Sequence, residues 1–281
     1  MPQRKTVKEI ATMKAGGQRI TMLTAYDAAM ARLFHSCGVD ILLVGDSLGM
    51  VMLGYDSTVP VTMDEMLHHC KAVRRGAPGA FIVGDMPFGS YQVEVEEAVR
   101  NGIRFLKQGG VDAVKLEGGL EVCPIVAALV RAGVPVMGHI GLTPQTASQM
   151  GGYKVQGRDE ESALRLLQEA RALEEAGAFS LVLECIPDQL AQVLSDSIAI
   201  ATIGIGAGAG CDGQVLVGHD LLGMFPKFTP SFVKKYADLA PQIEEAVKQY
   251  IVEVQGGTFP DEAHSFIVNT DYRAILKKHD G

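Results

Sequence analysis

The pattern of apolar and polar positions predicts eight short strands separated by helices. Several apolar runs are continuous, such as ILLV at 41–44 and LVL at 181–183, which is typical of strands buried on both faces of a parallel sheet. The predicted strands are Ile20–Ala25, Ile41–Gly45, Phe81–Gly84, Ala113–Leu116, Val134–Gly138, Ser180–Leu183, Ala199–Ile203 and Val215–Val217. Because they alternate with helices and no linker divides them, we expect a single closed (β/α)8 TIM barrel, with an open doubly wound sheet as the alternative.

Segments with helical periodicity fill the intervals between the strands. The predicted helices are Ala28–Ser36, Met63–Arg74, Val93–Gln108, Glu121–Ala132, Asp159–Ala176, Gln189–Ser195 and Ser231–Val254, the last a long helix or a pair of helices interrupted at Pro241. Asp159–Ala176 is the most amphipathic of these segments. Its apolar stripe is predicted to consist of Leu164, Leu167, Ala170 and Leu173.

The whole chain, residues 1–281, is expected to form one barrel domain with additions at both ends. Residues 1–19 form an N-terminal extension with an extra helix at Val7–Met13. Residues 256–281 form a C-terminal tail that is poor in core pattern, and we expect it to reach across the molecule or to a neighbouring subunit. The Leu142–Arg158 stretch is long for a connection between a barrel strand and its helix, which favours a lid over the site.

Composition narrows the class of protein. Hydrophobic residues make up 47% of the 281 positions and charged residues 21%, so the chain is too apolar to be disordered. Its formal net charge of −8 lacks the basic excess that binds phosphates, which argues against a nucleic-acid partner. The low share of charged residues favours additional buried surface, such as the interfaces of an oligomer.

The sequence carries no strong membrane or targeting signal. The longest uncharged stretch, Ser197–Cys211, has 15 residues, whereas a membrane-spanning helix needs about 20. The first ten residues, MPQRKTVKEI, lack the apolar core of a signal peptide. The five cysteines include no C-x-x-C pair, which favours reduced thiols over disulfides or a structural zinc site. We therefore expect a cytoplasmic protein with no membrane partner.

Four of the apolar runs end in a carboxylate, and this is where the chemistry is predicted. Asp46, Asp85, Glu117 and Glu184 follow four different predicted strands. The carboxyl ends of barrel strands form the active-site mouth, so these side chains should lie around one opening. A single Asp after a strand is usually a helix cap or turn residue. Four acids together are costly unless a cation or a proton lies among them, and a hard divalent cation such as Mg²⁺ is the favoured solution.

One lysine shares a strand with one of these acids. Lys115 and Glu117 are two residues apart, so both side chains face the same side of the strand. Val114 and Leu116 then face outwards against the helices, and Lys115 and Glu117 point into the barrel. A single lysine cannot neutralise four carboxylates. The alternative interpretation of Lys115 is that it only forms a structural ion pair with Glu117.

A set of ordered motifs resembles one known family. The motifs are VGDSLGMV at 44–51, GDMPFGSY at 84–91, VKLEGG at 114–119, GHIGLTPQ at 138–145, LECIP at 183–187, IGIGAG at 203–208 and DGQVLVGHDLLG at 212–223. Together they resemble the ketopantoate hydroxymethyltransferase family, from about Lys5 to Phe266. The variable tail after Phe266 is not covered by the resemblance.

The resemblance implies a (β/α)8 barrel and a Mg²⁺-dependent transferase. The reaction would move a hydroxymethyl group from 5,10-methylenetetrahydrofolate to 3-methyl-2-oxobutanoate through a metal-stabilised enolate. The products would be ketopantoate and tetrahydrofolate, in the first committed step of pantothenate and coenzyme A biosynthesis. The resemblance also implies a large homo-oligomer, commonly a decamer, with small-molecule substrates.

The family motifs also imply roles for individual residues. Asp46 and Asp85 would be metal ligands, with Glu117 at the metal directly or through its water shell. The oxo acid would contact Asp46, Ser47, Asp85 and Lys115, and Glu184 would be the catalytic base. From its position after the fifth strand, His139 is predicted to hydrogen-bond the substrate, with a packed core histidine as the alternative.

Two other functions compete with this interpretation. One is a different metal-dependent enzyme of 2-oxo acids on a similar barrel, such as a lyase or a phosphonopyruvate-type mutase. The motifs beyond the metal site, notably GHIGLTPQ and LECIP, argue against it. The other is a barrel that binds metabolites or assembles without catalysis, and the complete set of acids, lysine and base argues against that.

Overall fold

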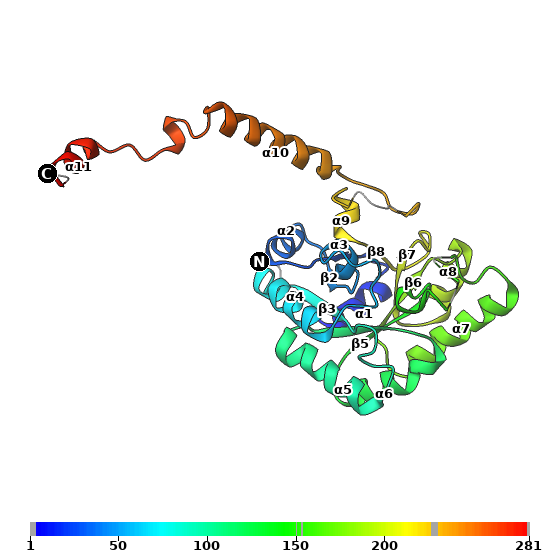
Figure 1. Ribbon diagram of the computed structural model, residues 1–281. Coiled ribbons are helices and arrows are strands. Elements are labelled where there is room, and N and C mark those ends of the chain that lie inside the picture. Colours follow the sequence, from blue (N-terminus) through cyan, green and yellow to red (C-terminus); the bar gives the residue numbers. More distant parts are fainter. Residues whose placement is uncertain (1–3, 150, 153, 226–229, 280–281) are drawn as a thin grey trace.

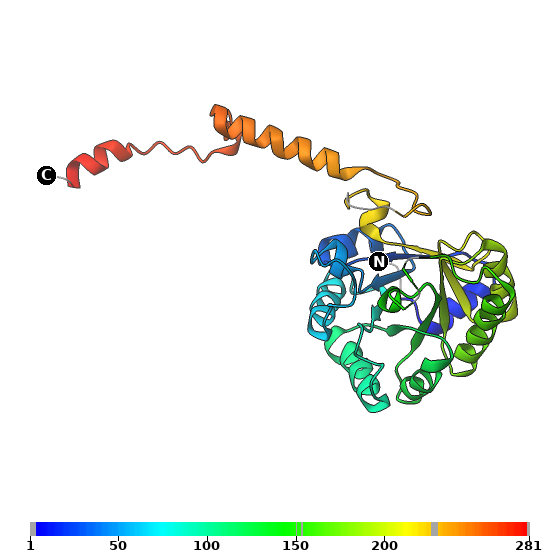
Figure 2. The ribbon, with the colours of Figure 1, turned by 45° about the vertical axis from the view of Figure 1, so that its right-hand side comes forward.

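Eight parallel strands close into a barrel, which confirms the predicted TIM fold and excludes the open sheet (Figures 1 and 2). The computed structural model describes residues 4–149, 151–152, 154–225 and 230–279. The strands are β1 (Ile20–Thr24), β2 (Ile41–Val44), β3 (Phe81–Asp85), β4 (Ala113–Glu117), β5 (Val136–Gly141), β6 (Ser180–Glu184), β7 (Ala201–Ile205) and β8 (Gly213–Leu216). Each pairs in parallel with its sequence neighbours, and β1 also pairs with β8.

Helices surround most of this barrel. They are α2 (Ala28–Ser36), α3 (Leu48–Val51), α4 (Met63–Gly76), α5 (Val95–Arg104), α6 (Cys123–Arg131), α7 (Glu160–Glu175), α8 (Asp188–Ser197) and α9 (Gly218–Leu221). Side chains at several N-termini satisfy backbone amides that have no partner within the helix. The Thr62 hydroxyl accepts from the amide of Glu65, whose side chain accepts from the amide of Thr62 in return. Such caps explain why the helices predicted to begin at Ala28 and Met63 are observed to begin there.

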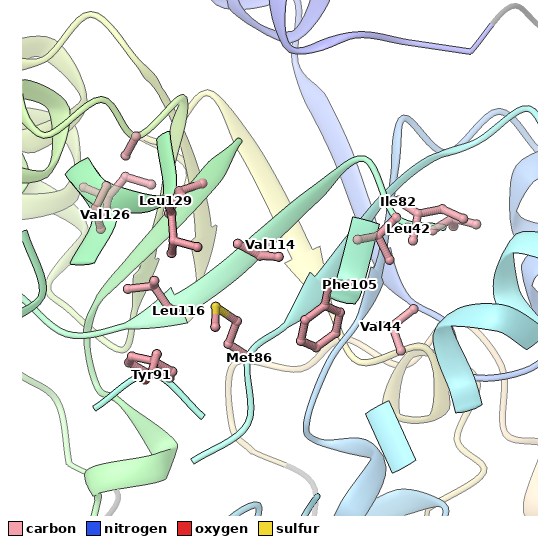
Figure 3. Close-up of a cluster of buried hydrophobic side chains, with 14 of the residues drawn as sticks. Leu42, Val44, Ile82, Met86, Tyr91, Phe105, Val114, Leu116, Val126 and Leu129 are labelled. Carbon is pink, nitrogen blue, oxygen red and sulfur yellow. The ribbon is translucent and has the colours of Figure 1, made fainter. Parts of the chain in front are cut away.

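Two apolar layers explain why the strand sequences are continuously hydrophobic. Along β2, Ile41 and Leu43 point into the barrel, whereas Leu42 and Val44 pack outwards against the helices. Figure 3 shows part of this outer layer, where side chains from β2, β3 and β4 meet those of the surrounding helices. Both faces of such a strand are removed from water, so neither face needs polar residues.

An N-terminal helix contributes to the inner layer. Helix α1 (Val7–Ala15) confirms the extra helix predicted in the 1–19 extension, of which residues 1–3 lie outside the described part of the chain. Ile10 and Met13 on α1 are buried and belong to the same cluster as the inward-facing residues of the strands. Apolar side chains therefore fill the barrel interior near the amino ends of the strands, and the polar side chains lie at the carboxyl ends.

The apolar stripe predicted for α7 is partly wrong. Leu164 is 52% exposed, whereas Leu166 is buried together with Ala170 and Leu173. Both leucines fit a helical repeat with the residues further along, so periodicity alone allowed either face. The barrel wall against which α7 packs selects the face with Leu166.

The predicted helix Ser231–Val254 begins too early. Helix α10 runs from Leu239 to Gly256, and Pro241 lies in its first turn instead of interrupting it. A proline is tolerated there because the first-turn amides have no partner within the helix. The preceding segment is held by α9 instead, since the amide of Tyr236 donates to the carbonyl of Leu221 (2.8 Å).

The chain after α9 leaves the barrel. Figures 1 and 2 show α10 and the following tail projecting away from it. Within the 256–281 tail, a helical turn covers Glu262–His264 and helix α11 covers Tyr272–His279; residues 280–281 lie outside the described part. Across the residues that the structure describes, every helix is too short or too polar to cross a membrane.

Candidate active site

A cavity of about 560 Å³ lies at the carboxyl end of the barrel and brings all the predicted site residues together. Its lining includes Asp46, Ser47, Asp85, Lys115, Glu117, His139 and Glu184. Apolar side chains from the connections above the barrel complete the walls. A mostly apolar cavity with a few convergent polar groups is the usual form of a small-molecule site.

The alternation of the strands explains this convergence. Ala113 at the start of β4 faces the barrel interior, so Lys115 and Glu117 on the same strand face it too. Val114 and Leu116 pack in the outer layer, as predicted. On β3, β5 and β6, the polar residues likewise continue an inward-facing row of apolar ones.

Lys115 and two aspartates form the charged centre of the cavity. The Lys115 ammonium forms a short ion pair with Oδ1 of Asp85, and both side chains are almost fully buried. The amide of Asp46 donates to Oδ2 of Asp85 (3.3 Å), which places the ends of β2 and β3 side by side. Asp85 therefore links the Lys115 ammonium on β4 to the end of β2.

Burial and neighbouring charges shift the pKa values of Asp46, Glu117 and Lys115. Burial, and then repulsion by Asp85, raises the pKa of Asp46 to about 7. Burial also raises the pKa of Glu117 well above its ordinary range, although Lys115 offsets part of this effect. Burial alone lowers the pKa of Lys115, but Asp85, Glu117 and Asp46 outweigh it and raise that pKa above its usual value. One lysine thus leaves negative charge uncompensated.

His139 lies between the two glutamates. Its Nδ1 is 3.6 Å from Oε1 of Glu117, and its Nε2 is 3.2 Å from Oε2 of Glu184. Both ring nitrogens are buried, yet neither contact has the directionality of a hydrogen bond. Burial, and then the Lys115 cation, lowers the pKa of His139, which favours the neutral form of the ring.

Glu184 occupies a different place from the other acids. Its side chain is 15% exposed, compared with 3% for Asp85 and Glu117. The residue after it, Cys185, has a φ of 48°, which is uncommon for any residue other than glycine. The amide of Cys185 donates to the carbonyl of Ile205 (2.9 Å), which ties this turn to β7. Glu184 is therefore the most exposed of the four acids, and the turn that follows it is bonded to β7.

Ser47 follows Asp46 and bonds away from the charged centre. Its hydroxyl is 2.9 Å from the hydroxyl of Tyr26, at the start of the connection after β1. Tyr26 itself is almost fully buried. Ser47 therefore lines the cavity while a neighbouring connection fixes its orientation.

Gln145 is a site residue that was not predicted from the sequence. Its side chain donates to Oδ2 of Asp46 (2.9 Å), and its backbone amide donates to Oε2 of Glu117 (3.0 Å). It lies in the predicted lid, Leu142–Arg158, of which residues 150 and 153 are outside the described part. The signal available in the sequence was its place at the end of GHIGLTPQ, but only the fold brings it to the acids.

The residues present fit a Mg²⁺ ion held by two carboxylates. In the described part of the chain, no three His, Cys, Asp or Glu side chains converge into a metal site of their own. Mg²⁺ needs fewer, because it keeps several waters and is usually bound through one or two carboxylates plus the substrate. Asp46 and Asp85 lie side by side at the ends of β2 and β3. The pKa of Asp46 is raised by burial and by repulsion from Asp85, and a bound cation would relieve this repulsion.

Fold and site together define the class: a (β/α)8-barrel enzyme with a buried acid–lysine centre at the mouth of its barrel. Sequence comparison identifies the particular group. The chain matches the family model of ketopantoate hydroxymethyltransferase over residues 4–262, and it belongs to that family.

Curated relatives are similar over almost their full lengths. The 3-methyl-2-oxobutanoate hydroxymethyltransferase of Desulfotalea psychrophila is 63% identical over 277 residues, which is 99% of each chain. The enzyme of the same name from Syntrophus aciditrophicus is 61% identical, over 93% of this chain and 96% of its own.

Solved structures share the fold at low sequence identity. A 2,3-dimethylmalate lyase of the PEP mutase/isocitrate lyase superfamily superposes with a TM-score of 0.57, at 16% identity and with full coverage of both chains. A phosphoenolpyruvate phosphomutase from Streptomyces platensis subsp. rosaceus gives a TM-score of 0.61 at 15% identity, over 98% of each chain. At this identity the likeness concerns the barrel alone, because one fold supports many reactions.

Proposed function

We propose that this chain transfers a hydroxymethyl group from 5,10-methylenetetrahydrofolate to 3-methyl-2-oxobutanoate. The products are 2-dehydropantoate (ketopantoate) and tetrahydrofolate, in the first committed step of pantothenate and coenzyme A biosynthesis. One observation carries the proposal: a member of the ketopantoate hydroxymethyltransferase family keeps every motif acid, the lysine and the base on the wall of one cavity. Its five cysteines are free thiols, which supports a cytoplasmic location.

Asp46 and Asp85 are the residues that would hold Mg²⁺, with Glu117 contributing directly or through a water molecule. When bound, Mg²⁺ acts as a Lewis acid that polarises the ketone of the oxo acid and makes its C3–H more acidic. Lys115 adds positive charge beside Asp85 and attracts the substrate's negative oxygens. These groups orient the oxo acid with its carboxylate and ketone towards the charged centre.

Glu184 is the group that takes the C3 proton. It lies on β6, away from the two aspartates, so it can reach C3 while the substrate's oxygens face the charged centre. His139, whose Nε2 is 3.2 Å from Oε2 of Glu184, borders the same space, and its lowered pKa favours the uncharged ring. A new bond then forms between C3 and the one-carbon unit of the folate, and water completes the hydroxymethyl group and frees tetrahydrofolate.

The first prediction is that turnover depends on both substrates and on a divalent cation. Purified protein with 3-methyl-2-oxobutanoate, methylenetetrahydrofolate and Mg²⁺ should form ketopantoate and tetrahydrofolate in equal amounts. EDTA should stop the reaction and added Mg²⁺ should restore it. Absence of product with Mg²⁺ present would contradict the transferase. Product formed at full rate after complete chelation would contradict the metal site only.

We also propose that the protein is a homo-oligomer larger than a dimer, for which the family resemblance suggests a decamer. All 18 residues of α10 are described, and none is buried. Ile243, Val247, Tyr250 and Val254 recur on one face of this helix, and each is 44–56% exposed. An apolar stripe of this kind is normally covered by another surface.

The barrel wall has a complementary gap. Thr21 on β1 and Gln214 on β8 are exposed on the outside of the barrel, whereas β2 to β5 are buried on both faces. The connection 206–212 between β7 and β8 is fully described and contains no helix. A hollow of about 760 Å³ lies over β1, β8 and this connection. We propose that helix α10 of a second copy of the chain fills this hollow, because its exposed apolar stripe needs a covering surface.

The second prediction concerns this association. Sedimentation equilibrium should give a mass several times the 30.0 kDa of one chain. Val247→Asp places a charge in the apolar stripe of α10 and should shift the protein towards the monomer. Gln249→Asp, on another side of the same helix, is the control and should leave the mass unchanged. A wild-type mass of 30 kDa at micromolar concentration would refute the oligomer.

A further inference from the structure

Gln145 is a buried amide with every polar group engaged. Its side-chain nitrogen donates to Oδ2 of Asp46 (2.9 Å) and to the carbonyl of Met86 (2.9 Å). Its side-chain oxygen accepts from the hydroxyl of Tyr91 (2.8 Å) and from the side-chain nitrogen of Gln92 (3.3 Å). The residue is 3% exposed, so water does not replace these partners.

These partners fix which side-chain atom of Gln145 is the nitrogen and which is the oxygen. The Met86 carbonyl can only accept, so it must face the nitrogen of Gln145. The oxygen then faces Tyr91, whose hydroxyl also accepts from the amide of Glu117 (3.2 Å). A glutamate at this position would place an oxygen against two acceptors, Asp46 and Met86. The site therefore requires an amide.

The backbone of the same residue engages the second acid. Its amide donates to Oε2 of Glu117 (3.0 Å), on β4, whereas its side chain reaches Asp46, after β2. Gln145 itself follows β5, in the Leu142–Arg158 connection. One residue thus joins the ends of three strands around the charged centre.

We propose that Gln145 is a positioning residue: it orients the carboxylates of Asp46 and Glu117 for the metal and anchors the Leu142–Arg158 connection to them. This inference rests on the metal site of the proposed function. Groups that hydrogen-bond a metal ligand fix its orientation, and their loss typically weakens metal affinity by about 10–100-fold. The role is indirect, because Gln145 is assigned no contact with substrate or metal.

The test measures metal binding without turnover. Mn²⁺ replaces Mg²⁺ as the probe, and its binding to the full-length protein is followed by electron paramagnetic resonance with no substrate present. Gln145→Met keeps the length of the side chain and removes its donors, so the Mn²⁺ affinity should fall about 10–100-fold. The control, Gln149→Met, lies in the same connection with an exposed side chain and should bind Mn²⁺ as the wild type does.

Steady-state kinetics separate positioning from general damage. In Gln145→Met, the Mg²⁺ concentration for half-maximal activity should rise by the same factor, and kcat at saturating Mg²⁺ should recover most of its wild-type value. A loss of kcat that Mg²⁺ cannot restore, with unchanged Mn²⁺ affinity, would overturn the proposal. Wild-type protein that binds no Mn²⁺ would instead refute the metal site on which the proposal rests.

A second variant decides the question if Gln145→Met does not fold. Tyr91→Phe removes the hydroxyl that holds the oxygen of Gln145 and leaves both donors of Gln145 in place. It should weaken Mn²⁺ binding less than Gln145→Met does. Where Gln145→Met does fold, the losses in the double variant should be less than additive, because both substitutions remove the hydrogen bond between Tyr91 and Gln145. Unchanged Mn²⁺ affinity in Tyr91→Phe, or strictly additive losses, would contradict the proposed coupling.

Discussion

Replacing Glu184 with Gln is expected to slow exchange of the C3 hydrogen of 3-methyl-2-oxobutanoate by about 10²-fold or more, the usual contribution of a positioned base. In heavy water with Mg²⁺, the wild-type protein should exchange this hydrogen for deuterium without any folate, because proton removal precedes transfer of the one-carbon unit. The exchange is followed by proton NMR. Gln has nearly the same size as Glu, so the cavity next to His139 keeps its shape while the base is lost.

The control for this experiment is Glu175→Gln, at the exposed end of α7, which should exchange at the wild-type rate. Exchange at the wild-type rate in Glu184→Gln would exclude Glu184 as the base. Glu117 would then be the next candidate, because it lies on the other side of His139. The raised pKa of Glu117 would make such a role strongly dependent on pH.

Replacing Asp85 with Asn should nearly abolish turnover while the barrel stays folded. The change removes one of the two carboxylates proposed to hold Mg²⁺, so the loss should exceed the approximately 10–100-fold that outer contacts of a metal ligand contribute. Removing one partner of a buried ion pair costs about 3–5 kcal/mol in general. The free energy of unfolding should fall by less here, because Asn still accepts a hydrogen bond and Glu117 and Asp46 still balance Lys115.

Three measurements check this prediction: kcat with saturating Mg²⁺, Mn²⁺ binding by the free protein, and the urea concentration at half-unfolding. Asp64→Asn is the matched control, because Asp64 pairs with Arg104 at the surface and its side chain is 89% exposed. The control should be unchanged in all three. Near-normal Mg²⁺-dependent turnover in Asp85→Asn would remove Asp85 from the metal site.

The shared barrel does not by itself separate this enzyme from lyases and mutases. Two of the solved structures that resemble it carry different activities in their names, at 15–16% identity. The closed barrel was predictable because all eight strands are marked by apolar runs, and the inward direction of Lys115 and Glu117 follows from the alternation of a strand. The reaction was predictable only from the motifs that fill the strand ends.

Other features could not be predicted from local sequence. Leu164 and Leu166 both continue a helical repeat, and only the position of the barrel wall against α7 buries the second. The segment before α10 resembles a helix in composition, yet the backbone amides of Tyr236 and Ala237 bond to the carbonyl of Leu221 instead. In each case a contact with a distant element decided between two locally acceptable conformations.

The sequence alone determined the eight strands, their inward rows and the identity of the acids, because strand alternation and apolar burial are local properties that repeat along the chain. Only the tertiary structure decided which polar groups meet. Gln145 bonds to Asp46, which is 99 residues away, and to Glu117, which is 28 residues away. Such contacts depend on closure of the barrel, which brings the carboxyl ends of all strands to one opening. The raised pKa of Asp46 arises in the same way, since it needs burial and a neighbouring strand's carboxylate at once.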